Sequence, residues 1–166
     1  MSESAAAKHH LRHEVLVGGI SNTVFNGLIA WLLLKSGPAL VWGGEHSFVV
    51  DVIATALLLP LIVALIVIPL QRSKLNKGKL QAISLGSAST TQAIADRFPA
   101  GTLKSALLFA LIGVCIIAPL TLIGFYLVGV EEVSPTHYAI FKGVWAGAIA
   151  ALLVIPMVLI ALRNPQ

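Results

Sequence analysis

The chain has 166 residues, of which 57% are hydrophobic and only 11% are charged. Soluble domains hold roughly 45–50% apolar and about 25% charged residues, so this composition excludes a single soluble globular domain. The formal net charge of +4 at neutral pH would suit a nucleic acid. The basic residues, however, flank long apolar blocks, as in the loops that set membrane topology, and we expect no nucleic-acid partner.

The first 14 residues are a polar tail that contains Lys8 and Arg12. The apolar block at residues 15–34 follows, and it has the ~20 mostly apolar residues that a membrane-spanning helix needs. No small-residue cleavage site closes this block convincingly. The pattern therefore favours a retained signal-anchor helix over a removed signal peptide.

Three further apolar blocks cover residues 48–70, 105–128 and 139–162. Each is long enough to cross a bilayer as a helix, and an open strand would leave backbone polar groups unpaired in lipid. The sequence therefore predicts an all-α integral membrane four-helix bundle. A basic loop at residues 71–104 separates a helical hairpin at 15–70 from a second hairpin at 105–162, and residues 163–166 form a tail.

The distribution of lysine and arginine predicts the orientation of the spans. Nine of these residues lie before the first span, between the second and third, or after the fourth: Lys8, Arg12, Arg72, Lys74, Lys77, Lys79, Arg97, Lys104 and Arg163. Only Lys35 and Lys142 belong to the opposite side. Because cytoplasmic loops are enriched in basic residues, we expect both termini and the central loop to be cytoplasmic, with the spans in the cell inner (plasma) membrane.

The start of the central loop is polybasic, with Arg72, Lys74, Lys77 and Lys79. Basic residues near an anionic membrane surface contribute on the order of 1 kcal/mol each. Besides the bilayer itself, anionic lipids are therefore the predicted partner of this segment. A solvated connector is the plainer interpretation.

A shift of 91 residues superimposes the two hairpins without gaps, and polar positions match as well as apolar ones. Asp51 then coincides with Lys142, and Arg72 with Arg163. This pattern indicates an internal duplication. Because each half would hold two spans, both halves would have the same orientation. A pseudo-twofold axis would then run along the membrane normal, unlike the axis of inverted repeats in many transporters.

Asp51 lies about one turn inside the second span, where an ionisable side chain is costly and marks a candidate functional site. Thr55 follows on the same helix face. Asn22 and Asn26 reach similar depths from the first span, so we predict a polar seam between the first two spans. Lys142 occupies the matching depth in the fourth span.

Asp51 and Lys142 leave two main interpretations open. They could form a buried ion pair that fixes helix packing, or they could line a polar cavity for an ion, a proton or a small solute. Contact with lipid head groups is a third interpretation. The asparagines are residues that more often join helices than bind ligands.

Small residues in the fourth span form a stripe that would let another helix approach closely. The stripe consists of Gly143, Gly147, Ala150 and Ala151. It predicts tight packing, either inside the bundle or between copies of the chain.

Recognised catalytic and cofactor motifs are absent from the sequence. There is no HExxH, no GxSxG and no glycine-rich phosphate loop, each of which would indicate a specific chemistry. His46 and His137 are weak candidates for a metal site on the outer face, because their spacing fits no ligand motif. We therefore expect no enzymatic activity and no cofactor.

Together these features predict a non-enzymatic scaffold or accessory subunit that packs against other membrane proteins or against itself. The alternative is a small transporter or channel that uses Asp51, Lys142, Asn22 and Asn26 as a polar centre. The exposure of the Asp51 side chain would distinguish between these two functions. A water-filled cavity beside this residue favours transport, and a dry, closed pair favours structure.

Overall fold

The computed structural model describes residues 3–82 and 90–163, and about 80% of the chain is helical. The helical elements in chain order are α1 (Glu3–Leu34), α2 (Phe48–Asn76), α3 (Thr90–Arg97), α4 (Thr102–Ile112), the π-helical turn η1 (Gly113–Ile117), α5 (Ala118–Val128) and α6 (Pro135–Leu162). Two short strands are β1 (Leu40–Val41) and β2 (Glu132–Val133). Residues 83–89 of the predicted basic loop and 164–166 of the predicted tail lie outside the described residues.

Among the described residues, four helical segments are long and apolar enough to cross a membrane: α1, α2, the continuous segment α4–η1–α5, and α6. The chain is thus all-α, as expected, and it fits a multi-pass membrane protein. The predicted spans and the observed helices share several ends, but some helices extend further. The predicted polar tail is helical from Glu3, and α2 continues past Leu70 to Asn76.

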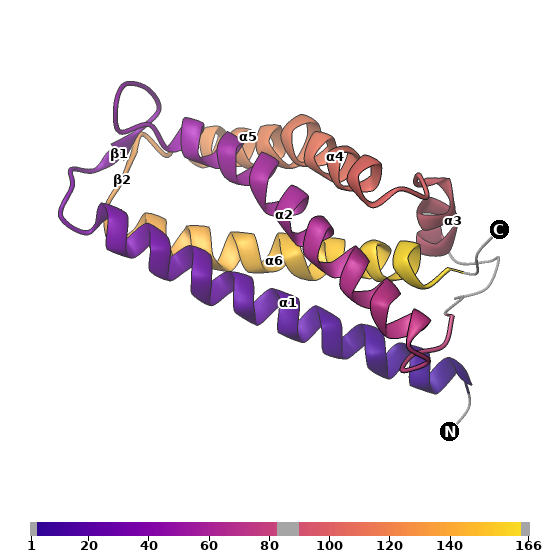
Figure 1. Cartoon of the computed structure of the whole chain (residues 1–166). Coiled ribbons are helices and arrows are strands. Elements are labelled where there is room, and N and C mark those ends of the chain that lie inside the picture. The colour runs from indigo at the N-terminus through magenta and orange to yellow at the C-terminus, as the bar shows by residue number, and fades with distance from the viewer. Residues whose placement is uncertain (1–2, 83–89, 164–166) are drawn as a thin grey trace.

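Helix α6 packs along both α1 and α2, and α2 also packs along α4, η1 and α5 (Figure 1). The two helices within each predicted hairpin are therefore not each other's main packing partners. The main partner of α1 is α6, and that of the third span is α2. Each helix of one predicted hairpin thus packs mainly against the other hairpin.

Close backbone approach explains why α1 packs on α6. A Cβ added to Gly147 would overlap the hydroxyl of Thr23, and one added to Gly143 would lie 2.8 Å from the Thr23 carbonyl oxygen. Gly19 and Gly27 face the same seam from α1. Small residues let two helices approach so closely that their backbones touch, which is the main packing device available in lipid.

The contact between α2 and the third span uses the same device. A Cβ added to Gly113 would overlap the carbonyl oxygen of Ala56 and lie 3.2 Å from Pro60. Gly113 is also the first residue of η1. The backbones of the second and third spans therefore touch at this point.

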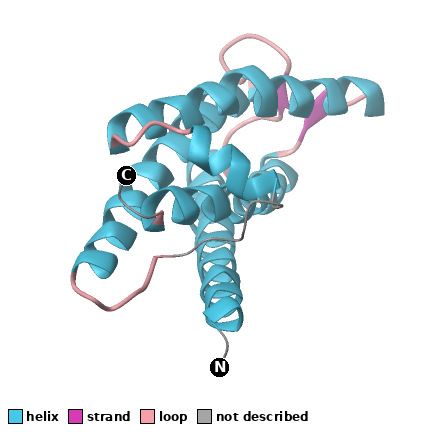
Figure 2. Ribbon diagram, turned by 90° about the vertical axis from the view of Figure 1, so that its right-hand side faces the viewer, coloured by secondary structure: helices cyan, strands magenta, loops and turns pink. Residues whose placement is uncertain are grey.

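The loops at the far end from the N-terminus of α1 are joined by the antiparallel pair β1–β2, in which Leu40 pairs with Val133 and Val41 with Glu132 (Figure 2). The indole Nε1 of Trp42 donates a 2.6 Å hydrogen bond to the carbonyl oxygen of Val130. Both links join the loop after α1 to the loop before α6, so they tie the two hairpins together.

The opposite end of the molecule holds the start of α1, the end of α2, the short helix α3 and the end of α6 (Figure 1). Arg72 donates a 2.7 Å hydrogen bond to the carbonyl oxygen of Ala100, and Arg163 donates one of 3.0 Å to that of Phe98. Phe98 itself stacks on Phe109, with ring centroids 4.6 Å apart. The two arginines thus hold the segment between α3 and α4 from two sides.

Candidate functional site

The polar centre of the chain joins α2 to α6. Lys142 Nζ lies 2.6 Å from Asp51 Oδ1 and 2.7 Å from Oδ2. Tyr138 precedes Lys142 by four residues, which places both on one face of α6, and its hydroxyl donates a 2.6 Å hydrogen bond to Asp51 Oδ2. Both carboxylate oxygens are therefore engaged by donors from a single helix.

The three side chains differ in exposure. Tyr138 is buried, and the side chain of Lys142 is 14% exposed, whereas that of Asp51 is 35% exposed. The cation is therefore more enclosed than its anion, and one side of the carboxylate remains open. The pairing that the sequence offered as one interpretation is present, with Tyr138 as an additional partner.

Tyr138 was missed by sequence reasoning, although a signal for it existed. A tyrosine one turn before an intramembrane lysine lies on the same helix face, and its hydroxyl needs a hydrogen-bond partner when buried. The ring also belongs to an aromatic cluster at this end, with Phe141 at a centroid distance of 5.9 Å. This cluster packs around Phe48, which is fully buried.

The predicted seam of asparagines does not form beside Asp51. Asn22 Nδ2 donates a 2.9 Å hydrogen bond to the Gly18 carbonyl oxygen, and Asn26 Nδ2 donates one of 3.0 Å to that of Asn22. Both bonds stay within α1, which packs along α6 and not along α2. Thr55 is buried on α2. The structure thus brings Asp51 and Lys142 together but leaves the asparagines on a separate helix.

The small-residue stripe of α6 is occupied inside the chain. Gly143, Gly147 and Ala150 are buried, and Ala151 is half-buried. A Cβ added to Gly19 of α1 would lie 3.3 Å from the Ala151 Cβ. Of the two packing modes that the sequence left open, the structure therefore uses the stripe within one copy.

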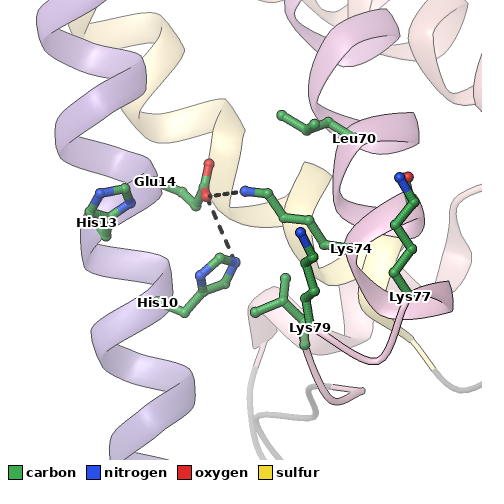
Figure 3. Close-up of a pocket in the computed structure, with 9 residues that line it drawn as sticks. His10, His13, Glu14, Leu70, Lys74, Lys77 and Lys79 are labelled. Atoms are coloured by element: carbon green, nitrogen blue, oxygen red, sulfur yellow. Dashed lines mark hydrogen bonds and ion pairs between the residues drawn. The ribbon is translucent and has the colours of Figure 1, made fainter.

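The four basic residues of the predicted lipid contact do not lie together. Arg72 donates a 2.9 Å hydrogen bond to Thr102 Oγ1 and so turns toward α4. Lys74, Lys77 and Lys79 instead line a cavity of about 490 Å³ between α1 and the end of α2 (Figure 3). They therefore do not act as one flat basic surface.

The candidate metal ligands lie at the far end of the molecule, His46 in the loop before α2 and His137 in the first turn of α6 and not in a loop as expected. Both His46 and His137 are exposed, and His137 Nδ1 lies 2.8 Å from Ser134 Oγ at the start of α6. Ser134 Oγ also accepts a hydrogen bond from the His137 backbone amide, as an N-cap residue does. Within residues 3–82 and 90–163, no group of three or more His, Cys, Asp or Glu side chains could hold a metal ion.

The polar centre offers limited chemistry. A carboxylate bonded to an ammonium and a phenol of another helix can fix the position of two helices, and it can exchange a proton if water reaches its open side. Comparisons of the chain with protein-family models, with curated proteins and with solved structures found no match.

Proposed function

We propose that this protein is a non-enzymatic multi-pass membrane protein that acts as a scaffold or accessory subunit of a membrane complex or homo-oligomer. The main support is that Lys142 and Tyr138 together engage both carboxylate oxygens of Asp51. These bonds connect the first turn of α2 to the start of α6 and fix the relative position of the two helices at this end of the bundle. A carboxylate with such close internal partners has little affinity left for a passing solute.

The proposed placement is the inner (plasma) membrane, with the four spans as a bundle and both termini in the cytoplasm. Its support is the charge distribution. The end that holds the start of α1 and the end of α6 also holds Lys74, Lys77 and Arg72 (Figure 1). The other end carries the β1–β2 pair and few basic residues, as an outer face should.

The surfaces open to a partner are the outer faces of α1 and of the third span. In the most apolar 18-residue stretch of α1, only 6% is buried by the chain itself, and in the corresponding stretch of the third span 28% is buried. Because the α6 stripe is already used, a partner helix or a second copy would contact these faces. In its absence they face lipid tails.

The scaffold function predicts association in a bilayer. Full-length protein in nanodiscs, analysed by cross-linking and mass measurement, should give a defined oligomer or a stoichiometric partner that purifies with it. A chain that stays monomeric in detergent and in nanodiscs, with no partner, would contradict the proposal.

Transport is the second candidate, and the 35% exposure of the Asp51 side chain favours it. If water reaches this carboxylate, the centre could pass an ion, a proton or a small solute through an oligomer. Proteoliposomes with wild-type protein should then show solute-dependent flux. Asp51→Asn should abolish it, while Asp96→Asn, the same change on α3, should not. The absence of flux in the wild type, or unchanged flux in Asp51→Asn, rules this function out.

We also propose that the chain is a tandem duplication with a pseudo-twofold axis between α2 and α6. Its support is that residues 91 positions apart meet at two depths. Val41 pairs with Glu132 in the strand ladder, and Asp51 pairs with Lys142. When a residue contacts the residue 91 positions away, the axis that relates the two halves must pass between them. At a third depth, the pair Arg72 and Arg163 bonds to one short segment.

A further inference from the structure

A cavity of about 490 Å³ opens between α1 and the end of α2, at the end of the molecule that holds the N-terminus of α1. His10, Glu14 and Lys74 point toward one another within it (Figure 3). Its size falls within the range of small-molecule sites, roughly 300–1,000 Å³. At this end the last turns of α2 approach α1 (Figure 1), and His10 Nε2 of α1 lies 3.1 Å from Gln71 Oε1 of α2.

The cavity wall is cationic. Lys74, Lys77 and Lys79 line it, together with two histidines, against a single acid, Glu14. Glu14 Oε1 lies 3.4 Å from Lys74 Nζ, so one lysine is neutralised inside the cavity. Within the described part of the chain, no acidic side chain pairs with Lys77 or Lys79, and both are exposed. Two ammonium groups thus remain for an anion.

The neighbouring surface is apolar. Leu70 belongs to the cavity wall and is 48% exposed, and one turn of α1 beyond the histidines Leu16 is 52% exposed. These side chains begin the apolar faces of α1 and α2. A ligand with an anionic head and an apolar tail would match both parts, whereas a free anion would match only the lysines.

We propose that this cavity binds the phosphate head group of an anionic phospholipid, whose acyl chains lie along the apolar faces of α1 and α2. The site rests on the membrane placement proposed above but not on the scaffold function. Lys77 and Lys79 would bind the phosphate. Glu14 would oppose it and would limit affinity by holding Lys74.

The test titrates full-length protein in neutral detergent with phosphatidylglycerol and counts bound lipid by native mass spectrometry. The double variant Lys77→Gln with Lys79→Gln should weaken binding roughly 30-fold, from about fivefold per lysine near an anionic head group. Lys8→Gln with Lys104→Gln removes the same charge from exposed residues at the same end, outside the cavity wall, and should leave binding unchanged.

Glu14→Gln provides a test of opposite sign, because it removes the only negative charge among the described residues of the wall and releases Lys74. It should tighten binding about fivefold. Equal losses in the two double variants, or weaker binding by Glu14→Gln, would overturn the site. Displacement of the lipid by free glycerol 3-phosphate would overturn the assignment to a lipid. A monomer that still binds phosphatidylglycerol selectively would remove the scaffold function and keep this site.

Discussion

Asp51 brings a charge into an apolar helix, and its neighbours compensate for it. An ion pair removed from water gains stability only when geometry and extra hydrogen bonds offset the lost hydration. Here Lys142 contacts both carboxylate oxygens, and Tyr138 adds a charge-assisted bond. The Asp51 side chain is 35% exposed, and water at its open side would lower the cost of the arrangement further.

Removing the cation should therefore cost more than removing both charges. Lys142→Met leaves the Asp51 carboxylate with Tyr138 alone, and we expect a loss of about 1–3 kcal/mol in the free energy of unfolding. The double variant Asp51→Asn with Lys142→Met should recover most of that loss. Reversible unfolding in mild detergent, followed by circular dichroism, measures both. Additive losses would show that the two residues are not coupled.

Sequence reasoning could pair Asp51 with Lys142 because depth in the membrane and the 91-residue offset both depend on sequence position alone. It could not place Asn22 and Asn26. Their short side chains reach carbonyl oxygens one turn back on the same helix, which competes with bonds to another helix. Which of the two occurs depends on the neighbouring helix, and sequence position does not specify it.

At the scale of helices, glycine positions decide which elements pack together. Gly147→Ala should destabilise the protein by about 1–3 kcal/mol, because the added methyl overlaps Thr23 at the α1–α6 seam and overpacking forces a shift. Gly124→Ala on α5 is a matched control, since its added Cβ would meet no atom within 4 Å beyond its chain neighbours and the nearby backbone of its own helix. It should be neutral or stabilise by up to about 1 kcal/mol through helix propensity.

Thermal unfolding of both variants in the same detergent provides the measurement. A loss in Gly124→Ala as large as that in Gly147→Ala would mean that the seam is not tight. Gly113→Ala adds an independent check at the other seam, because there the overlapping atom is a backbone carbonyl oxygen of Ala56 that cannot rotate away.

The existence and approximate ends of the long helices could be predicted because hydropathy and length determine them. Their partners could not, although one signal was present. Gly19, Thr23 and Gly27 are spaced four apart on α1 and form a small-residue face that matches the stripe of α6. The π-helical turn η1 also escaped prediction. It lies just before Pro119, which lacks an amide hydrogen to continue the regular ladder.

For the whole molecule, the proposed duplication gives the packing a common explanation. Under the 91-residue shift, Ala56 corresponds to Gly147 and Gly113 to Asn22. Ala56 touches Gly113 at one seam, and Gly147 touches Gly19 and Thr23 of α1 at the other. The two close approaches thus occur at nearly equivalent places. The same axis would explain why α1 packs on α6 while the third span packs on α2, since these two contacts are equivalent under the shift.

The proposed orientation makes a prediction for the intact cell. In a Cys115→Ala background, Glu45→Cys in the exposed loop near β1 should react with a membrane-impermeant maleimide added outside. Lys77→Cys at the end of α2 should react only after the membrane is permeabilised. The reason is the excess of basic residues at the end where Lys77 lies, which keeps that end in the cytoplasm. Labelling of Lys77→Cys in intact cells, with Glu45→Cys protected, would show the opposite orientation. The head-group cavity would then face the outer leaflet.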